Sequence, residues 1–336
     1  MSTRQYKILF FAIGIVTVAV LIYNTGWHSI VANIAAMGYW FLPVTGSWLV
    51  IYLLNAWAFH DIIREKDKPE TALPFGEVFR LTITGYAINY VTPFVGLGGE
   101  PYRVMELVPR LGVTKAASSV LQYGLMHMLA HVAFWLASIA LMITRPDLDG
   151  LLLAGCLVTL FTGLTLGYIF LRIYRQGFLV AALGYVSSWP LIGKQAALLL
   201  SSRYETLKRI DGQVTELYAN RKPVFYRALF LEFAARVVGC AEIYFIGVAT
   251  GPDMSWSDAV IVSSGSSLFA NLVFFFPMQL GTREGGMALA LGSIGLPAAS
   301  GVFISLVTRI RELVWIAIGY ALIYARNPNP EKRSGH

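Results

Sequence analysis

The chain alternates long apolar stretches with short charged segments, and this pattern restricts the fold more than any other feature. Crossing a bilayer takes about 20 mostly apolar residues. Stretches of this kind occupy residues 8–23, 39–60, 117–144, 151–171, 224–249 and 299–324. Charged residues make up only 13% of the chain, about half of their share in soluble domains. The sequence therefore predicts an all-α polytopic membrane protein with about six spanning helices, in which residues 1–336 form a single integral membrane domain.

Two further apolar regions, residues 78–112 and 258–297, are each divided by a break rich in proline and glycine. In both breaks a proline is followed seven positions later by a glutamate, with glycines between them: Pro93 and Glu100, then Pro277 and Glu284. Irregular backbone at membrane depth is tolerated only inside protein or beside a cavity. A matched pair of such breaks in the two halves of a chain indicates the binding site of a transporter.

Lysines and arginines gather in alternate connections between the apolar stretches. They precede the first stretch, follow the second, precede the third, fill residues 172–223 and end the chain, whereas residues 24–38 and 250–257 contain none. Positively charged loops stay in the cytoplasm. We therefore expect a multi-pass protein of the cytoplasmic (inner) membrane with both termini in the cytoplasm. Because the loops account for the net charge of +7, nucleic acid is not expected as a partner.

The loop charges also predict how the broken regions enter the membrane. Positive loops flank residues 78–112 on both sides, so this region enters and leaves from the cytoplasm, and residues 258–297 enter and leave from the outer face. Each region is then a re-entrant helical hairpin, and the two hairpins are opposed. Residues 39–144 and 224–324 form an inverted-topology repeat. The alternative is that each broken region contains one or two full spans.

The two repeats are joined by a cytoplasmic amphipathic connector, residues 172–223. Within it, apolar residues recur at roughly helical spacing at Leu200, Tyr204, Leu207, Val214 and Leu217. This spacing predicts a helix that lies on the inner leaflet. Its expected role is to join the two halves, and capture of anionic lipid by its basic residues is the alternative.

Charged residues at membrane depth must face one another or a wet cavity, because each is costly to insert. Arginine binds phosphate oxygens in a bidentate fork, and glycine lets a ligand approach the backbone closely. The breaks therefore predict a site for an anionic phospholipid or lipid-linked headgroup, although a small anionic solute fits the same chemistry. The candidate substrate-binding residues are Asn89, Thr92, Pro93, Gly96, Gly98, Gly99, Glu100, Arg103, Pro277, Gly281, Arg283, Glu284 and Arg309.

Glu232 and Arg236 are secondary candidates, because they lie at membrane depth on the fifth apolar stretch. An internal ion pair between them, four positions apart on a helix, is the simpler interpretation. His127 and His131 have the same spacing, but no third ligand is evident, so packing or polar contacts are expected rather than a metal. No phosphate-binding loop of the nucleotide hydrolases is present, and no cofactor is expected.

The two breaks carry a resemblance to a known family. The segments TPFVGLGGEPYR, from Thr92 to Arg103, and FPMQLGTREG, from Phe276 to Gly285, together with Arg309, resemble the signatures of the flippase-like membrane domain. This domain is the transmembrane region of lysylphosphatidylglycerol synthases. The resemblance covers nearly the whole chain and implies a stand-alone member without the aminoacyl-transferring domain.

What the resemblance implies is a protein that moves lipids or lipid-linked headgroups between leaflets. In this hypothesis Arg103, Arg283 and Arg309 hold the headgroup, and Glu100 and Glu284 balance their charge and exchange protons. Membrane lipids are the expected partners, with envelope-biosynthesis enzymes beside them. Two alternatives stay open: a membrane-embedded enzyme acting on lipid phosphates, and a non-catalytic lipid-binding subunit of an envelope pathway.

Overall fold

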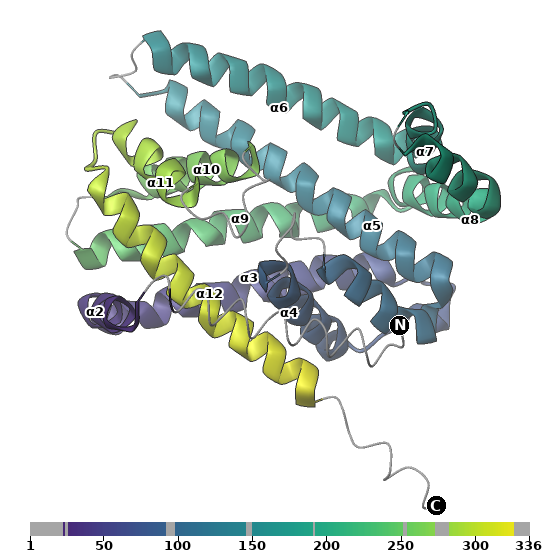
Figure 1. Cartoon of the computed structure of the whole chain (residues 1–336), viewed down its shortest axis with the longest axis horizontal. Helices are drawn as coiled ribbons and strands as arrows, with labels where there is room; N and C mark the ends of the chain where they lie inside the picture. The colour runs from purple at the N-terminus through teal and green to yellow at the C-terminus, as the bar shows by residue number, and fades with distance from the viewer. Residues whose placement is uncertain are drawn as a thin grey trace, which may run out of the picture. The chain divides into compact units, whose positions relative to one another are not determined.

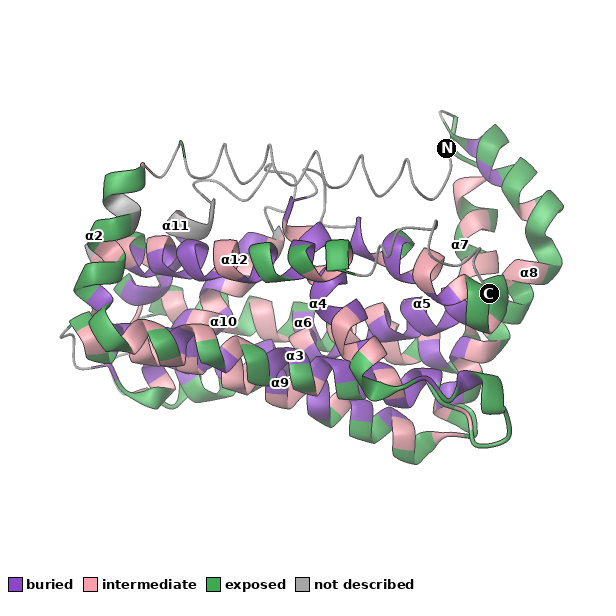
Figure 2. Ribbon diagram, turned by 90° about the horizontal axis from the view of Figure 1, so that it is seen from below, coloured by how far each residue is buried: buried purple, intermediate pink, exposed green. Residues whose placement is uncertain are grey.

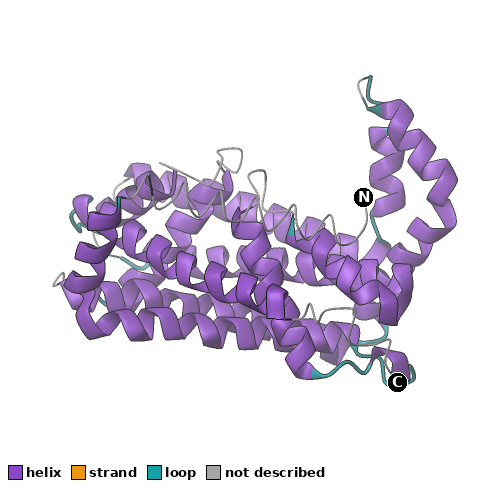
Figure 3. Ribbon diagram, turned by 60° about the horizontal axis from the view of Figure 1, so that its bottom comes forward, coloured by secondary structure: helices purple, strands orange, loops and turns teal. Residues whose placement is uncertain are grey.

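The computed structural model describes residues 23, 26–91, 98–145, 150–190, 192–250, 254–272 and 282–325 (Figure 1). These residues form helices and connecting turns, without a strand among them (Figure 3). The helices are α2 (Trp27–Met37), η1 (Gly38–Trp40), α3 (Phe41–Ile63), η2 (Pro69–Thr71), α4 (Phe75–Val91), α5 (Gly99–Ile143), α6 (Gly150–Gln176), α7 (Leu179–Val186), α8 (Gly193–Ala219), α9 (Lys222–Thr250), α10 (Trp256–Leu272), α11 (Thr282–Gly292) and α12 (Ala299–Ala325). The predicted first span, residues 8–23, lies almost entirely outside the described part.

Within the part of the chain that the structure describes, three helical segments are both long and apolar enough to cross a membrane: Val31–Ile63, Gly99–Ile143 and Gly150–Gln176. The first and third contain the predicted spans at residues 39–60 and 151–171, and the second contains the predicted span at 117–144 except for its last residue. Helices α9 and α12 have 29 and 27 residues, which is about 40 Å at a rise of 1.5 Å per residue, but both carry charged residues in their interior. The chain is thus a helical membrane protein with transmembrane helices.

Helix α5 is interrupted at Gly112, whose φ of 72° and ψ of 166° are not helical. A side chain is unfavourable at this φ, so glycine is the residue that permits the kink. Pro109, one turn earlier, removes a further backbone donor from the helix. The kink separates residues 99–111 from the long segment that follows, at the boundary that the sequence predicts between the first broken region and the third span.

The chain divides into two compact units. Unit 1 comprises Met1–Leu53, Gly76–Tyr102 and Val237–His336, and unit 2 comprises Leu54–Phe75 and Arg103–Arg236. The boundaries fall within α3, α5 and α9 and after the first residue of α4, so each of these helices contributes residues to both units. Both broken regions of the sequence belong to unit 1, except for the part of the first that begins at Arg103.

In unit 1, helix α12 is the common support. Its N-terminal half packs with α10 and α11 in a core that includes Val262, Leu291, Ile304 and Val307. Its C-terminal half packs against α4 through the four residues Ala87, Val91, Ile316 and Tyr320. Gly319 faces Ala87 so closely that the two helices leave no space for a methyl group. The missing side chain therefore allows α4 and α12 to approach.

Unit 2 is held together by hydrogen bonds between helix ends and side chains. The guanidinium group of Arg221 donates to the carbonyl oxygens of Asp61 and Ile62, at 2.9 and 3.2 Å, and so caps the C-terminal end of α3. The hydroxyl of Tyr174 in α6 donates to the carbonyl oxygen of Gln122 in α5 at 2.6 Å. Both contacts join parts of unit 2 that lie far apart in the sequence.

The amphipathic connector is helical over most of its length, as α7 and α8, but its apolar face is divided. Val214 and Leu217 are buried within the protein, and Gln213 beside them bonds with Ser118 and Gln122 of α5. The second half of α8 therefore packs against α5 instead of presenting its apolar face to lipid. Periodicity alone predicts an apolar face and cannot say what covers it.

Substituting Gly319 by alanine should destabilise the contact between α4 and α12, because the added methyl group overlaps Ala87. Overpacking of this kind costs about 1–3 kcal/mol. Thermal unfolding in detergent measures the loss. Gly124→Ala is the matched control, since open space surrounds that helical glycine and alanine favours helices. Equal melting temperatures for Gly319→Ala and wild type would contradict this packing.

Candidate functional site

At the first break, Asn89 connects the end of α4 to the start of α5. Its side-chain oxygen accepts a hydrogen bond from the N–H of Gly99 at 2.6 Å, and its side-chain nitrogen donates to Glu100 at 3.1 Å. A Cβ at Gly99 would collide with the carbonyl oxygen of Gly85. Asn89, Gly99 and Glu100 thus close the break as a helix cap, where the dipole of α5 favours the carboxylate.

Of the other candidates at the two breaks, Gly98 is fully described by the structure and seven are not. Gly98 is buried immediately before α5. Thr92, Pro93, Gly96, Pro277 and Gly281 lie outside the described residues. Arg283 and Glu284 belong to the first turn of α11, but their side chains also lie outside the described part. Nothing in the structure therefore tests the role of these seven positions.

Arg309 of α12 is buried, with 6% of its surface exposed. It lies between the half of α12 that packs on α10 and α11 and the half that packs on α4. The helices that lead into both breaks therefore rest on the helix that carries this arginine. Unit 1 thereby brings Asn89, Gly99, Glu100 and Arg309 into one compact part of the chain.

A buried ion pair joins three helices of unit 1. Arg311 of α12 donates from Nε and Nη2 to the two carboxylate oxygens of Glu242 in α9, both at 2.8 Å. The ring of Trp48 in α3 lies 3.6 Å from the guanidinium carbon, and its Nε1 donates to Glu242 at 2.8 Å. Neither charged side chain is more than 5% exposed. This arrangement combines a bidentate pair with a cation–π contact.

A second buried polar cluster lies in unit 2. The carboxylate of Glu232 in α9 lies 2.7 Å from Nδ1 of His127 in α5, and its side chain is fully buried. Arg236, one turn further along α9, contacts the same imidazole. Arginine can only donate, so Nε2 of His127 accepts from Arg236 and its Nδ1 donates to Glu232. His127 thus links the two residues for which the sequence predicts an ion pair, through the polar contact expected of this histidine.

Arg103 belongs to the same cluster. It is 2% exposed, its guanidinium carbon lies 5.3 Å from the ring of Tyr123, and its charge acts on both His127 and Glu232. Two arginines and one carboxylate therefore lie near His127 in the interior of unit 2. Sequence reasoning groups Arg103 with Glu100, three positions earlier on α5, and the boundary between the two units falls between these residues.

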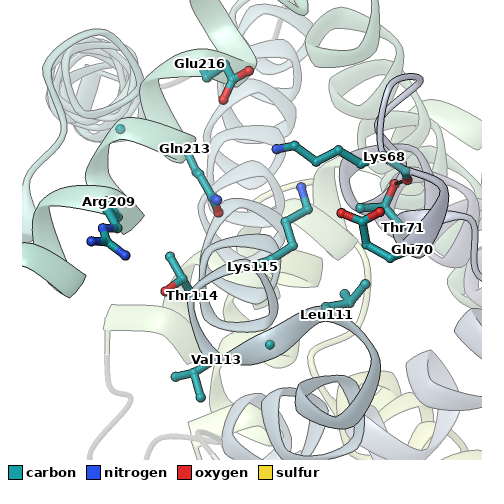
Figure 4. A pocket seen from close by; sticks show the side chains of 12 residues that line it. Lys68, Glu70, Thr71, Leu111, Val113, Thr114, Lys115, Arg209, Gln213 and Glu216 are labelled. Atoms are coloured by element: carbon teal, nitrogen blue, oxygen red, sulfur yellow. Dashed lines mark hydrogen bonds between the residues drawn. The ribbon is translucent and has the colours of Figure 1, made fainter.

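A pocket of about 550 Å³ opens in unit 2 beside the kink of α5 (Figure 4). Its lining includes Lys68, Lys115 and Arg209 together with Glu70 and Glu216. Sequence reasoning missed this pocket, because its residues come from the connection after α3, the kink of α5 and the second half of α8. The presence of Gly112 is the single local signal that the chain turns here.

The two lysines of this pocket already share a carboxylate partner. Glu65 forms ion pairs with both Lys68 and Lys115. Burial opposes the charge on Glu65, but the hydrogen bonds from the two lysines outweigh it and lower the pKa of the carboxyl group. The same contact with Glu65 raises the pKa of Lys68. With carboxylates also on the lining, the pocket has no surplus of positive charge for an anion.

Acidification should weaken this part of the fold. A carboxyl group with a lowered pKa stabilises the folded state above its unfolded pKa of about 4.3, and this contribution disappears as the pH falls through the folded pKa. Between pH 7 and pH 3, the melting temperature of wild type should fall more than that of Glu65→Gln. Parallel pH profiles for the two proteins would show that Glu65 is not the responsible group.

Breaking the buried pair of unit 1 should be strongly destabilising. Arg311→Met leaves the buried carboxylate of Glu242 without its pair, which costs about 3–5 kcal/mol. Glu242→Leu should cost less, because Glu312 still lies 3.9 Å from the guanidinium group of Arg311. The double variant removes both charges and should recover a large part of the lost stability. Thermal unfolding of the three variants forms a double-mutant cycle, and additive losses would exclude the direct interaction.

A known family matches this chain over most of its length, including the break motifs and nearly all of the predicted spans. Residues 7–319 match the family described as the lysylphosphatidylglycerol synthase transmembrane region. No curated protein and no solved structure gave a match. The matched residues span far more than half of the chain and agree with the resemblance seen at the two breaks. The chain therefore belongs to the family of lysylphosphatidylglycerol synthase transmembrane regions.

Proposed function

We propose that this protein moves an anionic phospholipid or a lipid-linked headgroup between the two leaflets of the cytoplasmic membrane. The chain belongs to the family of lysylphosphatidylglycerol synthase transmembrane regions. Because that name refers to a phospholipid, the family supports a role connected with membrane lipids. The observation that carries the proposal is the arrangement of unit 1. There α4, α10 and α11, which flank the Pro/Gly breaks, pack on α12, which also carries the buried Arg309.

The lengths of these helices support re-entrant hairpins. Helices α4 and α10 have 17 residues each and α11 has 11, so at 1.5 Å per residue they reach about 25 and 16 Å. A hydrocarbon core is about 30 Å thick. In the first broken region, the kink at Gly112 ends the second short helix after residue 111. With the loop charges, this favours two opposed hairpins in an inverted repeat and both termini in the cytoplasm.

Buried arginines supply the chemistry for an anionic headgroup. A guanidinium group keeps its charge at membrane depth and binds phosphate oxygens with several N–H donors. In this proposal each of the three residues Arg103, Arg283 and Arg309 contacts the phosphate at some point of its passage. Glu100, held at the start of α5 by Asn89, and Glu284 balance the charge. Arg311 is instead a structural residue, because Glu242 occupies its guanidinium group on two sides.

Such transport would be facilitated or coupled to an ion. The sequence contains no phosphate-binding loop of the nucleotide hydrolases, so hydrolysis of ATP by that route is not part of the proposal. The protein is proposed as a transporter rather than an enzyme, acting beside the envelope-biosynthesis enzymes that make or use its lipid.

The proposal is tested with purified protein in liposomes that carry a headgroup-labelled lipid in one leaflet. Labelled phosphatidylglycerol should cross faster than in protein-free vesicles, and faster than labelled phosphatidylcholine. A hydrogen bond to a charged group contributes about 1.5–3 kcal/mol, so Arg103→Ala and Arg309→Ala should each slow the crossing by about 10- to 100-fold. Arg110→Ala is the matched control, because Arg110 lies on the same helix as Arg103 but is exposed.

Two results would contradict the proposal. One is a crossing rate equal to that of protein-free vesicles with protein that is folded and monodisperse. The other is wild-type rates for both arginine variants. Mass spectrometry of the recovered lipid accompanies the assay, since a chemically altered headgroup would instead support a membrane-embedded enzyme acting on lipid phosphates.

A further inference from the structure

The hairpin formed by α7 and the first turns of α8 ends in apolar side chains that the described protein does not cover. Tyr185, Trp189, Ile192, Leu198 and Leu199 are between 44% and 70% exposed. We call these five residues the hairpin tip. The rings of Tyr185 and Trp189 pack edge to face with their centroids 6.1 Å apart. Figure 2 shows much of the hairpin in the exposed colour. An apolar group of this kind indicates a surface that meets another phase or partner.

The base of the hairpin is rigidly attached to unit 2. The carboxylate of Asp211 in α8 accepts hydrogen bonds from the N–H groups of Phe178, Leu179 and Val180, at 3.0, 3.0 and 3.1 Å. It thereby caps the start of α7. Gly177, with a φ of 73°, turns the chain from α6 into this cap. The tip therefore has a fixed orientation on the unit that carries α6.

Charge distinguishes the hairpin from the rest of the connector. Residues 177–204 contain no aspartate or glutamate, but they include Lys194 and Arg203. Both basic residues are exposed. Apolar and aromatic side chains combined with basic residues and no acidic ones are typical of segments that lie in the headgroup region of an anionic membrane. A water-soluble partner would require no such combination.

The position and the length of the hairpin also favour contact with the membrane surface. Helix α6 is one of the three segments apolar and long enough to cross the membrane, and it ends at Gln176. The tip begins nine residues later, so it stays close to the membrane surface. Helix α7 has eight residues, which is about 12 Å, so it can enter the interface but cannot cross the bilayer. Tryptophan and tyrosine are the residues enriched at that depth.

We propose that the hairpin tip inserts into the headgroup region of the bilayer, and that Lys194 and Arg203 bind the phosphates of anionic phospholipids there. The hairpin is thus a second lipid-binding surface, separate from the two breaks. Its function is to hold unit 2 against a leaflet that contains anionic lipid. The inference does not depend on transport, because a protein that moves no lipid could have the same anchor.

The test measures the depth of the tip in the whole protein. Cys156 and Cys240 are replaced by alanine, and a nitroxide is attached to a cysteine at Trp189 or Leu198. The protein is placed in nanodiscs of phosphatidylcholine alone or with phosphatidylglycerol. Collisions with oxygen report burial in lipid, and collisions with a water-soluble nickel chelate report exposure to water. A label at Glu205, which is exposed, is the reference for a water-facing position.

A label at the tip should collide with oxygen more often than with the nickel chelate. Phosphatidylglycerol in the membrane should increase the ratio of oxygen collisions to nickel collisions. The double variant Lys194→Gln/Arg203→Gln should lose that increase. Lys66→Gln/Lys222→Gln removes the same charge from two positions outside the hairpin and should retain it.

Three results would overturn the proposal. A tip label that collides mainly with nickel in both membranes would show a water-facing surface. An immobilised label that neither reagent reaches would show a protein partner or a second copy of the chain. A ratio that is the same with and without phosphatidylglycerol would exclude recognition of anionic lipid.

Discussion

The pairing of Glu242 with Arg311 is the interaction on which the interior of unit 1 depends. A charged side chain in the interior of a bilayer is costly, and the cost is reduced only when its hydrogen bonds and its charge are satisfied together. Here both guanidinium–carboxylate bonds are 2.8 Å long and Trp48 covers the pair. Because the three residues come from α3, α9 and α12, the same contact that neutralises the charges also fixes three helices.

Helix α9 extends this principle to both units. It contributes Glu242 to unit 1 and Glu232 to unit 2, and each carboxylate meets a partner on another helix, Arg311 of α12 or His127 of α5. Helix α9 can therefore carry acidic and basic residues in its interior and still belong to a membrane protein. In both clusters the charged residues hold helices together.

Much of the architecture follows from the sequence alone. The apolar stretches predict α3, α5 and α6, because lipid forces such stretches into helices. The two breaks predict where α4 ends and where α5 and α11 begin, since proline and successive glycines end a helix. The family follows from the same break motifs. A local signal of this kind is sufficient because each of these features depends on residues close together in the chain.

The partners of the charged residues could not be predicted in this way. Sequence spacing suggests an ion pair between Glu232 and Arg236, whereas the structure inserts His127 between them. Arg103 approaches Tyr123 of the same unit, a contact that no local spacing indicates. For the same reason, the sequence could not predict which face of α8 packs on α5. The sequence by itself determined a helical membrane protein with two matched breaks, because lipid and backbone chemistry act locally. Only the tertiary structure decided which buried charges meet, because those contacts join helices that lie far apart in the chain.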